Sequence, residues 1–212
     1  MTAKRILVLG ATGATGREVV AQALGRGLDV TALVRSPARL PITHEHLRIV
    51  TGDVTGGPES LNAAMRGQDA VISALGVGKS FKPGGLIARS APMIVHAMES
   101  AGVRRLVFTS AYGVGVTWRD VPLVPRILIR LFLRDVYADK AAGEEALARS
   151  NLDWTLVYPV TLTNGARTGR SHTGERLALR GVPTVSRADV AEFLLSQLED
   201  RTYLRKGVLI SG

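Results

Sequence analysis

The sequence has no cysteine, few aromatic residues and no long hydrophobic run. Without cysteine, the 212 residues can form no disulfide bond and offer no catalytic thiol, a composition typical of a reducing compartment. The apolar runs at 106–108 and 127–133 are too short, or too interrupted by arginine, to cross a bilayer about 30 Å thick. The first apolar run ends at Gly10, too early for the hydrophobic region of a signal peptide. These absences predict a cytoplasmic protein without a transmembrane helix.

Positive charge exceeds negative charge, which gives a net charge of +9 and raises the question of nucleic acid. The excess is mostly arginine scattered along the chain, without a basic tail, and only 5% of the residues are aromatic. An anionic cofactor needs only a few of these cations. We therefore do not expect nucleic-acid binding. The histidines, at positions 44, 46, 96 and 172, lack metal-ligand spacing, so no metal site is expected.

Short β-branched runs alternate with longer segments of helical periodicity, which predicts an α/β fold. Strands are predicted at 5–9, 29–34, 47–51, 70–73, 104–109, 154–158 and 208–210. Helices are predicted at 15–26, 58–65, 87–101, 136–150 and 187–200. The expected architecture is a Rossmann-like, doubly wound parallel sheet that forms one domain over residues 1–212. Two stretches, 76–85 and 113–134, break the alternation, and we expect both to be loops over the site.

Helix ends are marked by residues suited to capping. Gly27 and Gly102 each follow a predicted helix, where a left-handed backbone is common. Ser186 precedes the last helix and can accept a hydrogen bond from its first turn, in which Asp189 faces the positive end of the helix dipole.

A glycine-rich turn joins the first strand to the first helix. Its three glycines, three residues apart, suit a tight turn, close approach to a pyrophosphate and close packing of helix on strand. The N–H groups that begin the helix attract phosphate, and two threonine hydroxyls can add donors. The turn predicts a dinucleotide site, rather than a glycine turn without a ligand, formed by Gly10, Thr12, Gly13, Ala14, Thr15 and Gly16.

The end of the second strand indicates which dinucleotide binds. NAD-specific folds place a carboxylate there for the ribose 2′-hydroxyl, whereas this chain has Arg35 followed by Ser36. A guanidinium suits a phosphate through paired N–H donors. We therefore expect NADP(H) as the cofactor. The alternative is that Arg35 is exposed to solvent and has no role in binding. Arg39 either assists Arg35 or belongs to the following loop.

Several blocks, in order along the whole chain, resemble one protein family. They are 10–16, 52–54, 109–112, 151–159 and 186–191. Together they resemble the atypical short-chain dehydrogenase/reductase superfamily, in its NAD(P)H-binding branch of biliverdin/flavin reductases and NmrA-like redox sensors. The combination is specific for the branch and not for a substrate.

The resemblance implies further cofactor contacts. Asp53 and Val54 would lie beside the adenine, and Ala74, Leu75 and Gly76 would line the cofactor. Thr109 and Ser110 would lie near the nicotinamide, Lys140 would reach its ribose, and Tyr158, Pro159 and Val160 would contact the carboxamide end. Except for Lys140, all lie at or just past the carboxyl ends of predicted strands, the edge where open α/β sheets bind ligands.

One departure from the superfamily bears on catalysis. Ketone reduction there uses a tyrosine four residues before the lysine, but Val136 occupies that position and Tyr137 is one residue late. On a helix this shift turns the side chain by about 100°. Ser110, Tyr112 and Lys140 are the remaining candidate catalytic residues. Because a reduced flavin or quinone takes its proton from water, the missing tyrosine favours such an acceptor over a simple ketone.

The segment from Pro125 to Arg134 carries three arginines four residues apart among apolar residues. We expect a helix that faces the core and exposes one arginine stripe. The alternatives are a cap on the substrate pocket, a dimer contact or peripheral contact with an anionic membrane.

Three functions fit the sequence. The leading hypothesis is an NADPH-dependent oxidoreductase that passes hydride to a flavin, a quinone or a related planar carbonyl acceptor. The second is a non-catalytic NADP(H)-sensing regulatory protein, and the third is a ketoreductase of a tailoring pathway. The chain would be a monomer or a homodimer.

Overall fold

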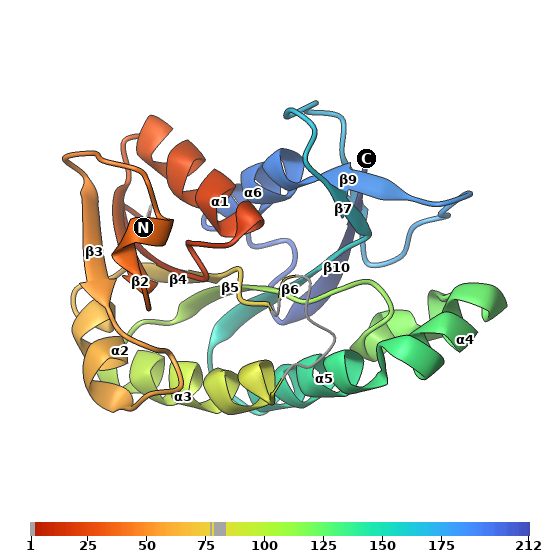
Figure 1. Ribbon diagram of the computed structural model, residues 1–212, viewed down its shortest axis with the longest axis horizontal. Coiled ribbons are helices and arrows are strands. Elements are labelled where there is room, and N and C mark those ends of the chain that lie inside the picture. The colour runs from red at the N-terminus through yellow and green to blue at the C-terminus, as the bar shows by residue number, and fades with distance from the viewer. Residues whose placement is uncertain (1–2, 77, 79–83) are drawn as a thin grey trace.

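A sheet of eight strands forms the centre of the molecule, in the order β3-β2-β1-β4-β5-β6-β10-β8 (Figure 1). The computed structural model describes residues 3–76, 78 and 84–212. Neighbouring strands run parallel, except that β8 pairs antiparallel with β10. The strands are β1 (Arg5–Leu9), β2 (Asp29–Val34), β3 (Leu47–Thr51), β4 (Ala70–Ser73), β5 (Arg105–Thr109), β6 (Asp153–Pro159), β7 (Thr161–Thr163), β8 (His172–Gly174), β9 (Thr184–Ser186) and β10 (Lys206–Ser211).

Helices cover both faces of this sheet, with α1 and α6 on one side and α2, α3 and α5 on the other (Figure 1). Their bounds are α1 (Ala14–Gly25), α2 (Pro58–Met65), α3 (Leu86–Ala101), α4 (Leu123–Phe132), α5 (Arg134–Ala148) and α6 (Arg187–Ser196), with short 3-10 helices at η1 (Pro37–Arg39) and η2 (Gly115–Asp120). The Rossmann-like fold class is therefore confirmed. Among the described residues, no helix is long and apolar enough to cross a membrane.

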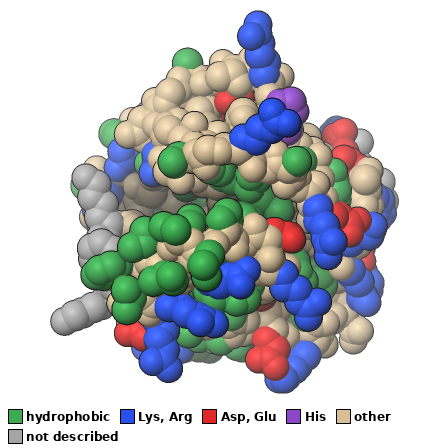
Figure 2. All heavy atoms as spheres, turned by 90° about the vertical axis from the view of Figure 1, so that its right-hand side faces the viewer, with side chains coloured by type: hydrophobic (Ala, Val, Ile, Leu, Met, Phe, Trp, Pro, Cys, Tyr) green, Lys and Arg blue, Asp and Glu red, His purple; other side chains and the backbone are tan. Residues whose placement is uncertain are grey.

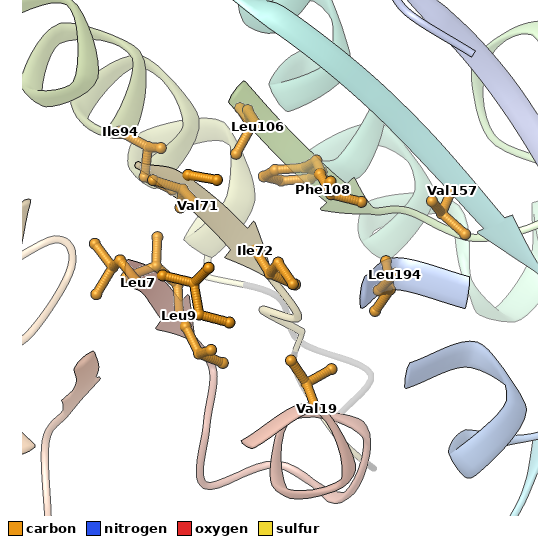
Figure 3. Packing of buried hydrophobic residues seen from close by; sticks show 14 of the residues in the cluster. Leu7, Leu9, Val19, Val71, Ile72, Ile94, Leu106, Phe108, Val157 and Leu194 are labelled. Carbon is orange, nitrogen blue, oxygen red and sulfur yellow. The ribbon is translucent and has the colours of Figure 1, made fainter. Parts of the chain in front are cut away.

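The central strands are buried on both faces, which explains their continuous apolar sequences. Figure 3 shows Val19 of α1 and Leu194 of α6 against one face of these strands, and Ile94 of α3 against the other. The apolar residues of β1, β4 and β5 between them are all buried. The sheet is thus rigid where its strands end, and the residues that follow those ends are held in place.

The predicted elements are close to the observed ones. β1 to β4 and α2 have the predicted bounds, and the others differ by one or two residues, except that α6 ends four residues early. Gly27 and Gly102 have the expected left-handed backbone, with φ of +72° and +71°. Ser186 Oγ accepts a hydrogen bond from the backbone N–H of Asp189 at 2.9 Å, so the predicted cap is confirmed.

The loop predicted at 113–134 is wrong, because η2 and α4 lie within it. Its two prolines do not prevent a helix: Pro122 precedes α4 and Pro125 lies in its first turn, where a backbone N–H has no partner to lose. The core-facing helix expected at 125–134 is also wrong, since no residue of α4 is buried. In the other predicted loop, residues 77 and 79–83 lie outside the described residues.

Two buried contacts hold α5 against α3 and so position the candidate site residues on α5. The carboxylate of Asp139 accepts hydrogen bonds from the backbone N–H groups of Ile87 and Ala88, at 3.0 and 2.9 Å, and so caps α3. One turn along α5, Gly143 lies so close to α3 that a Cβ atom there would be 2.5 Å from the Ile87 side chain.

Candidate cofactor and active site

The turn between β1 and α1 has the geometry of a phosphate-binding loop. Gly10 has φ of +79°, and a Cβ atom there would lie 2.6 Å from the carbonyl oxygen of Ala74. A Cβ atom on Gly16 would lie 2.1 Å from the carbonyl oxygen of Gly10. Gly13 precedes α1, and no side chain caps the N–H groups of its first turn. The turn therefore presents bare backbone donors at the positive end of a helix, as a pyrophosphate requires.

A cavity of about 300 Å³ lies beside this turn, at the carboxyl ends of β1, β2, β3 and β4. It brings together nine predicted cofactor residues: Gly10, Thr12, Gly13, Arg35, Asp53, Val54, Ala74, Leu75 and Gly76. Ala14, Thr15 and Gly16 form the adjoining first turn of α1 and are not part of its wall. Residues up to 66 positions apart in sequence, such as Gly10 and Gly76, thus meet where open α/β sheets bind ligands.

Two arginines line the end of this cavity next to β2. Arg35 follows the strand, Arg39 lies in η1, and both belong to the cavity wall. Arg35 Nη1 is 3.9 Å from a carboxylate oxygen of Asp53, and its side chain is 74% exposed, so it is accessible to a ligand. The backbone N–H of Thr55 lowers the pKa of Asp53, with smaller contributions from the Thr55 hydroxyl and from Arg35. The wall is therefore cationic where a 2′-phosphate would lie.

Buried hydroxyl groups at the ends of β4 and β5 also fit a cofactor. Ser73 is the last residue of β4 and Thr109 the last of β5, and their side chains are buried. Neither hydroxyl oxygen has a hydrogen-bond partner among the described residues. A buried hydroxyl without a partner is costly, so each would gain from a polar ligand group at its strand end, although neither side chain lines the wall of either cavity.

A second cavity, of about 780 Å³, opens at the same edge of the sheet, beyond β5 and β6. Three predicted site residues line it: Tyr112, Pro159 and Val160. Most of its wall is apolar and comes from the segments at 121–129 and 177–183, with Arg176 as a cation at its border. Its volume lies within the range of sites for drug-sized molecules, roughly 300–1,000 Å³.

The buried carboxylate of Glu144 accepts hydrogen bonds from both Ser110 and Tyr158. Ser110 Oγ donates a hydrogen bond to Glu144 Oε1 at 2.5 Å, and the Tyr158 hydroxyl donates to Glu144 Oε2 at 3.0 Å. All three side chains are buried. Burial raises the pKa of Glu144, and the hydrogen bonds from Ser110 and Tyr158 oppose that increase. The ring of Tyr158 packs closely on Gly207, so its side chain lies in the core and only its backbone can face a ligand.

Lys140 lies one turn before Glu144 on α5, and its pKa is lowered by burial, an effect that Glu144 and Asp139 oppose. The neighbouring tyrosines are already engaged. Tyr137 donates its hydroxyl proton to the backbone carbonyl of Tyr112 at 3.1 Å, and Tyr112 donates to the carbonyl of Asp120 at 2.6 Å.

Sequence reasoning missed Glu144 entirely. The sequence does contain a sign of Glu144, because Lys140 and Glu144 are four residues apart on a predicted helix and so share one face. Gly52, which also lines the smaller cavity, was not named as a candidate site residue. Its position directly before Asp53, after a strand, was the available sign.

Comparison with known proteins identifies the fold and the type of ligand. The model of a protein family described as NAD(P)H-binding matches residues 10–201. The chain is 32% identical over 174 residues to an uncharacterized chloroplastic protein of Arabidopsis thaliana, which covers 78% of this chain and 62% of that protein. It is 30% identical over 213 residues to (4-alkanoyl-5-oxo-2,5-dihydrofuran-3-yl)methyl phosphate reductase of Streptomyces griseus. This match covers 98% of this chain and 67% of that protein.

A solved structure shares the fold. The chain superposes with a TM-score of 0.83 on a short-chain dehydrogenase/reductase from Veillonella parvula in complex with NADP, at 21% identity, over 99% of this chain and 95% of that one. The expected nicotinamide dinucleotide is thus confirmed by the family match. The chain spans about three fifths of the length of its Arabidopsis relative.

Proposed function

Because the chain belongs to the NAD(P)H-binding family, we propose that it is an NADPH-dependent reductase that passes hydride to a flavin, a quinone or a related planar carbonyl acceptor. One observation carries the proposal: the glycine-lined cavity and the larger apolar cavity open at the same edge of one sheet, on either side of the end of β5. A dinucleotide with its adenosine beside β2 would extend along that edge toward the larger cavity. The bound cofactor supplies the hydride.

The larger cavity supports an extended apolar acceptor. Pro122, Ile129, Val160 and Leu179 are among the residues of its wall, which suits the faces of a ring system. Arg176, on the exposed border, would hold a carboxylate or phosphate carried by such an acceptor. The wall would also exclude water from the reacting atoms, which strengthens electrostatic contacts there.

The residues between the cavities would position the nicotinamide end of the cofactor. Thr109 offers a buried hydroxyl with no partner among the described residues, and Lys140 would contribute a donor to the ribose. The Ser110 hydroxyl is buried and donates its hydrogen bond to Glu144, so it would not serve as a proton donor to the substrate. This arrangement suits an acceptor that is protonated by water after hydride transfer.

The proposal is tested by the rate of NADPH oxidation, followed at the absorbance of the reduced nicotinamide. Free flavin, a set of quinones and a diketone are compared, with NADH in parallel. We expect turnover with a flavin or a quinone, and a preference for NADPH. Tight NADPH binding without oxidation by any acceptor would instead support an NADP(H) sensor, in agreement with the missing superfamily tyrosine.

A ketoreductase is the second candidate activity, because Tyr112 and Tyr137 both line the larger cavity. Under our proposal, Tyr112→Phe and Tyr137→Phe each change turnover of a flavin or quinone by less than about threefold, since neither hydroxyl has to supply a proton. If either variant lowers kcat by about a hundredfold or more, that tyrosine is a general acid and the ketoreductase is favoured. Steady-state kinetics of both variants with a diketone and a quinone decide between the two.

Cofactor preference tests the role of Arg35. Arg35→Ser is expected to raise the KM for NADPH by about ten- to a hundredfold, because a charge-assisted hydrogen bond contributes about 1.5–3 kcal/mol. The KM for NADH should stay the same. Arg66→Ser is the matched control, since Arg66 is exposed and lies outside the cavity wall. An equal rise of both KM values in Arg35→Ser would contradict recognition of the 2′-phosphate.

A further inference from the structure

The helix α4 exposes an apolar face that no described part of the chain covers. Its large apolar side chains on this face, which are 48% to 69% exposed, are Leu123, Val124, Ile127, Leu128, Leu131 and Phe132. The spacing of these residues, in adjacent pairs four residues apart, places them on one side of a helix. Figure 2 shows hydrophobic side chains gathered on this side of the molecule. In Figure 1 the helix extends outward from the N-terminal start of α5.

A row of arginines borders this apolar face. Arg126 and Arg130 are four residues apart in α4 and so lie on one side of the helix, and Arg134 follows as the first residue of α5. The guanidinium groups of Arg126 and Arg130 lie 5.4 and 5.5 Å from the ring centre of Trp118, which holds this edge in place. α4 itself contains no acidic residue. Asp120 and Asp135 lie just outside its two ends.

We propose that α4 docks the protein on the surface of an anionic lipid bilayer, with the helix lying in the interfacial plane. An amphipathic helix whose apolar side enters the acyl boundary beside a row of cations has the chemistry of such a site. Anionic lipid headgroups complement the exposed Arg130 and Arg134 and the net charge of +9, whereas Arg126 donates to the backbone carbonyls of Trp118, Arg119 and Val121. At ten residues, or about 15 Å at 1.5 Å per residue, α4 lies on a bilayer rather than across it.

Charge favours the bilayer over a second copy of the chain as the occupant. Two copies that buried this face against each other would bring two arginine rows and two net charges of +9 together. That repulsion opposes self-association, whereas the same charges attract an anionic surface. A lipid interface also accepts the whole apolar face without requiring a complementary protein shape.

Docking would bring an acceptor dissolved in lipid close to the larger cavity. The inward side of α4 contributes Pro125 and Ile129 to the cavity wall, so its outward side places the cavity beside the bilayer. This consequence rests on the proposed function. The docking itself does not, because vesicle binding needs neither acceptor nor turnover.

The test is co-sedimentation of the full chain with large vesicles, at low and at physiological salt. Vesicles of phosphatidylcholine alone are compared with an equal mixture of phosphatidylcholine and phosphatidylglycerol. We expect binding to the mixed vesicles, at least about tenfold weaker binding to the neutral ones, and weakening by salt. Leu128→Glu/Leu131→Glu should abolish binding, and Arg130→Glu/Arg134→Glu should weaken it by at least about tenfold.

Arg66→Glu is the charge-matched control, because Arg66 is exposed at the end of α2, outside α4 and the arginine row. It should bind mixed vesicles nearly as well as the wild type. Thermal unfolding of each variant checks its fold, which exposed substitutions should preserve. The proposal is overturned by equal sedimentation with neutral and anionic vesicles, by no sedimentation with either, or by a dimer in light scattering that Leu128→Glu/Leu131→Glu dissociates.

Discussion

Gly16→Ala should lower the free energy of unfolding by about 3 kcal/mol and weaken NADPH binding by about a hundredfold or more. The added Cβ atom would lie 2.1 Å from the carbonyl oxygen of Gly10 and 2.9 Å from the Cα atom of Ala11. Both neighbours are backbone atoms, so no side chain can move aside. Helix α1 must therefore shift away from β1, and its first N–H groups move from the position where a pyrophosphate would meet them.

The same helix supplies the control. Gly25 is the last residue of α1, is exposed, and has nothing within 4 Å of the position of an added Cβ atom. Gly25→Ala should leave NADPH binding unchanged and should raise stability by up to about 1 kcal/mol, because alanine favours helix over glycine. Urea unfolding and fluorescence titration with NADPH measure both quantities. If Gly16→Ala binds NADPH as tightly as Gly25→Ala does, the turn is not a cofactor site.

The cofactor turn was predictable because its signals are local. Gly10, Gly13 and Gly16 lie within seven residues, and each acts through the backbone conformation or the close packing of its own turn. The position of Arg35 in the wall of the smaller cavity was predictable for a related reason, because the apolar residues of β2 show where that strand ends. Local pattern and local structure agree at these positions, and the parallel sheet then brings them together.

The residues that sequence reasoning missed depend on contacts between distant segments. Glu144 gains its importance from Ser110, 34 residues away, and no local pattern announces that pairing. The arginine-striped segment was expected to face the core because apolar residues usually do. In the structure, α2, α3 and α5 cover that face of the sheet, and α4 lies beyond the start of α5 with no buried residue. Burial depends on what else competes for the same surface, and one sequence does not reveal this competition.

Glu144→Ala should lower the free energy of unfolding by about 3 kcal/mol or more, comparable to removing one partner of a buried ion pair. The change leaves the hydroxyls of Ser110 and Tyr158 without their acceptor, and it removes one of the two carboxylates, Glu144 and Asp139, that favour the charged form of Lys140. It also opens a space beside Gly115, whose backbone lies against the carboxylate. Glu144→Gln keeps the volume and one acceptor oxygen and carries no buried charge, so at neutral pH it should be at least as stable as the wild type. Urea unfolding of both variants at neutral pH measures the difference.

The dependence of stability on pH isolates the charge of Glu144. Folding raises the pKa of this buried carboxyl above its ordinary value of 4.5, so the folded state binds the proton more tightly than the unfolded chain. Its contribution to stability is therefore present below pH 4.5 and is lost as the pH rises through the folded pKa. The loss is about 1.4 kcal/mol for each unit by which folding raises the pKa.

Glu144→Gln should remove this loss, and Glu145→Gln, which changes an exposed neighbour on the same helix, should not. Unfolding is measured from acid to neutral pH for the wild type and both variants. Parallel curves for all three proteins would show that folding does not change the pKa of Glu144. A wild-type curve that falls below that of Glu144→Gln as the pH rises would show that the carboxyl next to Ser110 is buried and has a raised pKa.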